Sequence, residues 1–246
     1  MNVNKTIEKL EGHSSNLLTF YLGTVRKYAL IDPMIFDKEV CENRGSDRAA
    51  TGFSIIRNTI YYGVLQDIAN IVFDNGKSNP SIVNIVDKLS HEGVVNGLRE
   101  KYALEYCADP ELAEVYRQRE EINRAKFNTY FEQLSKLADE VINSNEFKAA
   151  KSVRDEFTAH LDLQYVDGSY EYPDIKQYGL KWNSLKIMLE QLKQLISYVG
   201  YIVRNADFAW ESFEAQNSRL SVGFWDSPNA NNTLKRDKVL RTSPLS

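Results

Sequence analysis

The sequence predicts an all-α protein, an antiparallel helical bundle with additional helices. Apolar residues recur at helical spacing over most of the 246 residues. The 12 glycines and 6 prolines are few for this length and lie mainly at segment boundaries. No stretch alternates as a strand does, and the chain carries no internal repeat, glycine-rich phosphate loop, HExxH or nucleophile elbow. The mostly short connections imply that successive helices run antiparallel.

The first part of the chain predicts two long helices. The first covers about residues 15–30, and a polar loop over about residues 37–47 follows it. The second covers about residues 48–73, with isoleucines, Phe53 and Val64 forming one apolar side. Asp74-Asn75-Gly76 is a strong stop signal for this helix.

Two further helices and a long charged one are predicted next. Pro80 at a first helical position favours a helix over about residues 81–90, which continues weakly over 92–102 because glycines interrupt it. Asp109-Pro110-Glu111 supplies a cap, a proline and an acid in order, and starts a helix that reaches about Ile142. Its many i,i+4 charge pairs are typical of a solvated face.

The last third of the chain predicts one more long helix and a tail. Residues 165–179 form a loop whose tyrosines pack it onto its own domain, or stack on unpaired bases. A helix over about residues 183–216 is apolar enough to be central. Ser, Asn, Pro and Gly then accumulate, although Phe224 and Trp225 suggest that the tail is partly tied down. We therefore expect one helical domain, 1–216, and a loop-rich C-terminal tail, 217–246.

The composition of the chain argues against two functional classes, general binders of duplex nucleic acid and membrane proteins. The net charge of −4 and a pI of about 5.6 argue against a general duplex binder, because such domains are usually basic. No apolar run approaches the ~20 residues that span a bilayer, and the N-terminus lacks the apolar core of a signal peptide. We therefore expect a cytoplasmic protein without membrane association.

The cysteines and two of the three histidines predict no cofactor and no metal site. Cys41 and Cys107 show no CxxC spacing, and we interpret both as reduced structural residues. His13 and His91 stand alone in ordinary segments, so each is expected at a surface or a helix end.

A predicted helix over residues 145–164 carries the most informative pattern. Asn145 is a plausible N-cap. One apolar stripe follows it: Phe147, Ala150, Val153, Phe157 and Leu161. Arg154 and His160 flank this stripe, about 120° apart around the axis and roughly 9 Å apart along it. This separation is too large for one compact site on a single helix, whereas two copies meeting across a twofold axis could converge on one substrate.

The flanking residues fit metal-free phosphodiester cleavage. The planar fork of Arg154 can hold a phosphate, and His160 can move the proton of a ribose 2′-hydroxyl or of the leaving oxygen. Glu156, four residues before His160, would favour the imidazolium and orient the ring. The alternative is a helix with a solvated face and a histidine at the edge of the core.

The string Arg154-Asp155, four further residues and His160 resembles the R-x4-6-H motif of the HEPN superfamily. The local sequence R-D-E-F-T-A-H-L-D is similar to the AbiU2 branch, which is linked to abortive phage infection in bacteria. The resemblance covers about residues 15–215 in layout. It implies a HEPN-like bundle in which Arg154 holds the scissile phosphate, His160 transfers protons and Asp155 orients one of them. One branch carries a modified tyrosine two residues after the histidine, where this chain has Asp162.

The resemblance leaves two functions open. Many members of the superfamily are metal-independent RNases that act as dimers, which predicts an endoribonuclease with a composite site across a homodimer. Such an enzyme would serve in phage defence or as a toxin held by a protein antitoxin. Other members are inactive modules that bind RNA or a protein partner, and the acids around the motif favour that alternative.

Overall fold

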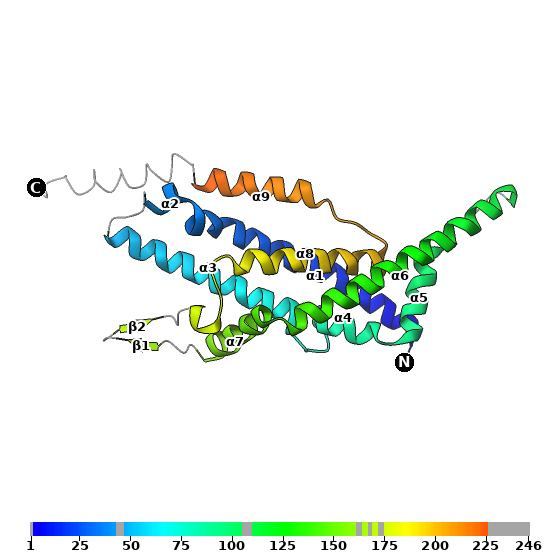
Figure 1. Ribbon diagram of the computed structural model, residues 1–246, viewed down its shortest axis with the longest axis horizontal. Coiled ribbons are helices and arrows are strands. Elements are labelled where there is room, and N and C mark those ends of the chain that lie inside the picture. The colour runs from blue at the N-terminus through cyan, green and yellow to red at the C-terminus, as the bar shows by residue number, and fades with distance from the viewer. Residues whose placement is uncertain are drawn as a thin grey trace, which may run out of the picture. The chain divides into compact units, whose positions relative to one another are not determined.

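The computed structural model describes residues 2–42, 47–104, 110–160, 164–166, 169–171 and 175–225. Over these ranges the predicted all-α fold is confirmed (Figure 1). The α-helices are α1 (Val3–Phe36), α2 (Lys38–Glu42), α3 (Asp47–Phe73), α4 (Ile82–Leu89), α5 (Glu92–Ala103), α6 (Ala113–Asn143), α7 (Asn145–His160), α8 (Ser184–Arg204) and α9 (Trp210–Trp225). Two 3₁₀ turns, η1 (Pro110–Leu112) and η2 (Ile175–Tyr178), precede α6 and α8.

The chain forms two compact units. The first comprises residues 1–24 and 62–208, and the second comprises residues 25–61 and 209–246. Helices α1 and α3 are each divided between the two units. The boundary falls after Thr24 in α1 and before Tyr62 in α3. The candidate residues of the motif on α7 all belong to the first unit.

Helix α8 is the centre of the first unit. It packs against α5, α6 and α7, while α6 also contacts α4, α5 and α7 (Figure 1). The apolar positions predicted for α8 are buried: Leu185, Met188, Leu189, Leu192, Ile196, Val199 and Val203. The hydroxyl of Tyr21 on α1 donates to the carbonyl oxygen of Leu189 at 2.9 Å in the core. The helical periodicity of the sequence thus correctly identified the buried face.

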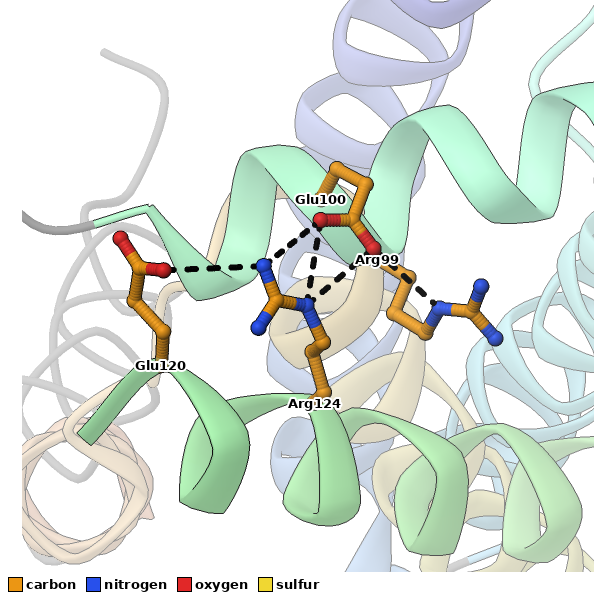
Figure 2. Close-up of polar contacts among 4 residues, drawn as sticks. All are labelled: Arg99, Glu100, Glu120 and Arg124. Atoms are coloured by element: carbon orange, nitrogen blue, oxygen red, sulfur yellow. Dashed lines mark hydrogen bonds and ion pairs between the residues drawn. The ribbon is translucent and has the colours of Figure 1, made fainter. Parts of the chain in front are cut away.

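The first unit also contains a charged cluster that joins α5 to α6 (Figure 2). The Nε and Nη2 atoms of Arg124 on α6 donate to the carboxylate of Glu100 on α5 at 2.9–3.2 Å. Glu120, one turn before Arg124, lies 3.6 Å from Nη2, and Nε of Arg99 lies 3.6 Å from Glu100. The hydrogen bond from Arg124 holds the pKa of Glu100 below its usual value. The α5–α6 contact at Arg124 is therefore ionic, and next to it the ring of Tyr102 on α5 meets the buried Phe127 of α6, with the ring centroids 5.8 Å apart.

The second unit packs α9 against the C-terminal half of α1. Oγ of Ser221 donates to the carbonyl oxygen of Ala29 at 2.7 Å. Nε1 of Trp225 donates to that of Leu30 at 3.0 Å. Trp225 therefore packs on the domain, as predicted. The contact is made from α9, which the sequence had not indicated as a separate helix.

The predicted single helix over residues 183–216 is wrong. Helix α8 ends at Asn205, which adopts a left-handed conformation with φ of 49° and donates its backbone N–H to Tyr201. Asparagine tolerates this conformation better than most residues, so it is a common helix terminator. A new helix, α9, then runs to Trp225, past the predicted end at 216. The division into a domain 1–216 and a tail 217–246 stays a prediction, with its boundary inside α9.

Three smaller expectations also differ from the structure. The polar segment after α1 contains the short helix α2, and α1 itself extends from Val3 to Phe36, with Pro33 within its last turns. The prediction that the chain has no strands is wrong. Strands β1 (Gln164–Val166) and β2 (Ser169–Glu171) form an antiparallel hairpin with Tyr165 opposite Tyr170. Strands of three residues are too short to give a period-2 signal.

The helices in the described ranges fall short of what a bilayer crossing needs: none of them is both sufficiently long and sufficiently apolar.

Candidate functional site

Helix α7 carries the candidate motif and is anchored by one apolar face. Phe147, Ala150 and Val153 are at most 1% exposed, as the predicted stripe requires. The helix contacts α6, α8 and η2. Its N-cap is Ser144 and not the predicted Asn145, because Oγ of Ser144 accepts the backbone N–H of Glu146 at 3.1 Å. The one-residue shift leaves the register of the stripe unchanged.

Arg154 projects from the edge of this face, and its partners include Asp155 and Asn70. Its Nε and Nη2 atoms lie 2.8 and 2.7 Å from Oδ1 of Asp155. Its Nη1 atom donates to Oδ1 of Asn70 on α3 at 3.3 Å. The side chain of Arg154 is 18% exposed, whereas that of Asp155 is 52% exposed. The guanidinium is thus half-sheltered and fixed in orientation by a carboxylate and an amide.

A second contact joins α3 to α7 one turn further along. Nζ of Lys151 lies 5.7 Å from the ring centroid of Phe73, within the range of a cation–π interaction. Phe73 follows Asn70 by three residues, and Lys151 precedes Arg154 by three. The two pairs therefore run in opposite order, which shows that α3 and α7 are antiparallel where Arg154 is held.

Glu156 interacts with a residue that the sequence had not suggested. The hydroxyl of Tyr178 in η2 donates to Oε2 of Glu156 at 2.6 Å. This hydrogen bond links η2 to the surface of α7 and occupies the carboxylate that was expected to face His160. The Glu156 side chain lies on the exposed arc of the helix, as its position in the sequence predicts.

His160 is the last residue of α7, and its side chain lies outside the described part of the structure. The side chain of Phe157 and residues 161–163, with Leu161 and Asp162, lie outside it too. The structure therefore brings together Arg154, Asp155 and Asn70, and separately Glu156 and Tyr178. The expected contact between Glu156 and His160 stays a prediction.

Sequence reasoning missed Asn70 and gave Tyr178 no role in the site. Asn70 had a detectable signal, because it is a single amide inside the apolar run from Ile68 to Val72. A polar group at such a position needs a partner when it is partly buried. Tyr178 was one of several tyrosines in a predicted loop, and nothing local distinguishes it from the others.

Among the isolated histidines and cysteines, one residue differs from expectation. His13 is buried within α1, at 6% exposure, so its predicted place at a surface or helix end is wrong. His91 does lie at a helix end, as the exposed N-cap of α5. Cys41 is a free thiol at the surface, and Cys107 is outside the described residues. Within the described ranges, no three His, Cys, Asp or Glu side chains gather as metal ligands.

The fold and the site define a class of protein: an all-α module whose late helix presents an orientated arginine in an R-x4-6-H string. The family model described as AbiU2, of the HEPN group, matches residues 7–224, and the chain belongs to this family. The protein is thus an abortive-infection-type HEPN module. The match ends at residue 224, in the last turn of α9. Neither a curated protein nor a solved structure matches the chain.

Proposed function

We propose that this protein is a metal-independent endoribonuclease that acts in phage defence. The observation that carries the proposal is the fixed guanidinium of Arg154, held in a half-sheltered position by Asn70 and Asp155. A guanidinium that is already orientated loses less conformational freedom when it binds a phosphate through its fork. In this role Arg154 binds the scissile phosphate, and Asp155 with Asn70 positions it.

The chemistry assigned to His160 is proton transfer. The ribose 2′-oxygen attacks the neighbouring phosphorus as its proton passes to a base. The bond from phosphorus to the 5′-oxygen then breaks, and that oxygen receives a proton. The products are a 2′,3′-cyclic phosphate and a 5′-hydroxyl, so atoms and charge balance without any further reactant. An imidazole suits both proton transfers because it titrates near neutral pH.

A homodimer would assemble the reacting groups. On a regular helix His160 follows Arg154 by about 120° around the axis and roughly 9 Å along it. Two copies of α7 across a twofold axis place the arginine of each copy near the histidine of the other. Sedimentation that shows only monomer at micromolar concentration, while RNA is still cleaved, contradicts the composite site.

The test is cleavage of single-stranded RNA in the presence of EDTA. We expect Arg154→Lys to impair cleavage strongly, since lysine retains the charge but loses the fork. We expect His160→Ala to slow it by about 10²–10⁴-fold. Lys148→Ala is the matched control, because Lys148 is exposed on the same helix and belongs to no part of the proposed site. A His160→Ala protein that cleaves as fast as the parent rules out the assignment, as does cleavage that requires added divalent metal.

A specific observation supports a second function, a non-catalytic module that binds RNA or a protein partner. Nε and Nη2 of Arg154 both contact Asp155, a carboxylate that competes with phosphate for the same guanidinium. The net charge of −4 also argues against binding of a nucleic acid over a large area of the surface. On this reading, the parent binds its partner without cleaving RNA, and Asp155→Asn changes affinity without creating activity.

The cellular role that we propose is defence against phage from a cytoplasmic location, with a protein antitoxin as a possible restraint on the nuclease. Expression in a bacterial host tests it. We expect the parent protein to lower phage plating efficiency and the Arg154→Lys variant not to do so. Equal plating efficiency with both proteins contradicts the proposed link between the site and defence.

A further inference from the structure

A pocket in the first unit lies away from α7 and has a mixed lining. It holds about 310 Å³ of empty space, part of which is open to solvent. Its walls come from α1, α5 and the end of α8 (Figure 1). The apolar part of the lining consists of side chains that are at most 3% exposed: Leu98, Ile202 and Val203. The charged part consists of Glu11, Lys101 and Arg204. An apolar wall with a few charged groups is typical of a site for a small organic ligand.

The packing of α1 on α5 brings the first two charged groups together. The helices approach closely at Gly97, where a Cβ atom would lie 2.8 Å from Cδ1 of Ile7. Glu11 follows Ile7 by four residues, and Lys101 follows Gly97 by four. One helical turn beyond the close approach, Nζ of Lys101 donates to Oε1 of Glu11. The two helices therefore run parallel at this point, and the charge of Glu11 is compensated.

Arg204 is held at the same pocket by a second contact with α1. Its Nε atom donates to Oγ of Ser14 at 3.0 Å, and Ser14 is only 2% exposed. Ser14 follows Glu11 by three residues, so both side chains lie on one face of α1. In the part of the chain that the structure describes, neither Nη group of Arg204 has a hydrogen-bond acceptor or a carboxylate partner. The guanidinium is thus anchored at Nε with the other end of its fork unused.

The charged lining of the pocket leaves one positive charge without a counterion. Glu11 and Lys101 neutralise each other, whereas Arg204 forms no ion pair within the described ranges. Arg204 is partly buried, and a cation that is withdrawn from water without a partner costs free energy. The two Nη groups of a guanidinium match the two oxygens of a carboxylate, so a bound carboxylate would reduce this cost.

We propose that this pocket binds a carboxylate carried by a small aliphatic group. The Nη groups of Arg204 hold the carboxylate, and the aliphatic group lies against the wall of Leu98, Ile202 and Val203. The single surplus charge of the lining matches a monoanion, whereas a phosphate dianion would bring one charge too many. The site is built from α1, α5 and α8, so it does not depend on the proposed ribonuclease activity of α7.

Calorimetric titration of the full chain at neutral pH tests the chemistry of the ligand. Isovalerate is the probe, and isovaleramide is its neutral control of nearly the same shape. We expect isovalerate to bind and the amide to bind at least about tenfold more weakly, because only the acid forms charge-assisted hydrogen bonds with the guanidinium. No measurable binding of isovalerate, or equal binding of the amide, overturns the proposal.

Two variants test the assignment of the charged residues. Arg204→Gln should weaken isovalerate binding roughly 10- to 100-fold, as the loss of hydrogen bonds from a charged group does. Glu11→Gln should strengthen binding, because it removes a negative charge and releases Lys101 toward the ligand. Lys186→Gln is the matched control, an exposed residue of α8 whose loss changes the net charge of the chain by as much as that of Arg204.

Circular dichroism verifies that each variant is folded. Parent-like affinity in a folded Arg204→Gln protein refutes the site. If Arg204→Gln does not fold, Glu11→Gln decides the question, since its ion pair is partly exposed and unchanged or weaker binding contradicts the proposed charge balance.

A free acid and the C-terminus of a peptide carry the same chemistry, and a third comparison separates them. The ligands are isovalerate, an acetylated tripeptide that ends in leucine, and the C-terminal amide of that tripeptide. Tighter binding of the tripeptide acid than of isovalerate supports a peptide terminus as the ligand, and weaker binding supports a free acid. Equal binding of the tripeptide acid and its amide contradicts recognition of the carboxylate.

Discussion

The anchoring of α7 by Phe147 gives a quantitative prediction about the helix that carries the motif. Phe147 is fully buried in the first turn of α7. Its replacement by alanine removes a ring from the core and leaves a cavity, which costs about 3–5 kcal/mol. This is a large part of the ~5–15 kcal/mol that stabilises a typical domain. With a urea m-value of roughly 2–3 kcal/mol per molar, the unfolding midpoint should fall by about 1–2 M.

The assay is urea unfolding followed by circular dichroism at 222 nm, which reports on helix content. Lys148→Ala is the control, since Lys148 is the exposed neighbour of Phe147 on the same helix and its loss should change the free energy of unfolding by less than about 0.5 kcal/mol. If Phe147→Ala and Lys148→Ala unfold at the same urea concentration, the packing assigned to α7 is wrong.

Three further predictions concern single polar contacts. Ser81→Ala removes the N-cap of α4, so thermal melting should show a loss of about 1–2 kcal/mol. Tyr21→Phe deletes the buried hydrogen bond to the Leu189 carbonyl, and denaturant unfolding should report a loss of about 1 kcal/mol. Glu100→Gln removes an ion pair with Arg124. Because the pKa of Glu100 is lowered in the folded state, its contribution exists above its ordinary value of 4.5 and disappears as pH falls through the folded value. Urea midpoints of parent and Glu100→Gln should therefore differ at neutral pH and converge in acid; a gap that persists unchanged in acid would refute the ionic origin.

Local signals in the sequence were sufficient for the boundaries of α3 and α4. Asp74-Asn75-Gly76 stops α3 at the predicted end, and α4 begins within one residue of its predicted start, although Pro80 precedes the N-cap Ser81 and does not occupy the first helical position. These signals work because caps and glycine or proline act on the backbone over three or four residues. The same reasoning failed at both ends of α1, which runs from Val3 to Phe36 and not over residues 15–30, and at Asn205, where the terminator is neither glycine nor proline. It also failed at Gln164, which lies in the three-residue strand β1 and not at the end of a helix over residues 145–164.

In the candidate site, too, the sequence predicted some contacts and missed others. Helical spacing was enough to place Arg154 beside a buried stripe and Asp155 next to it. The contact with Asn70 joins residues 84 positions apart, and nothing in either local sequence encodes the pairing of α3 with α7. The same holds for Tyr178, which reaches Glu156 only because η2 packs on α7.

The sequence by itself thus determined the helical class, the buried faces and the family motif, because these depend on residue spacing along one helix. Only the tertiary structure decided which side chains hold Arg154, and that His13 is buried, which lowers its pKa. The physical reason is that burial and charge at a residue depend on every element packed against it. A single histidine on a helix looks the same in the sequence whether its side chain faces solvent or is buried by other helices.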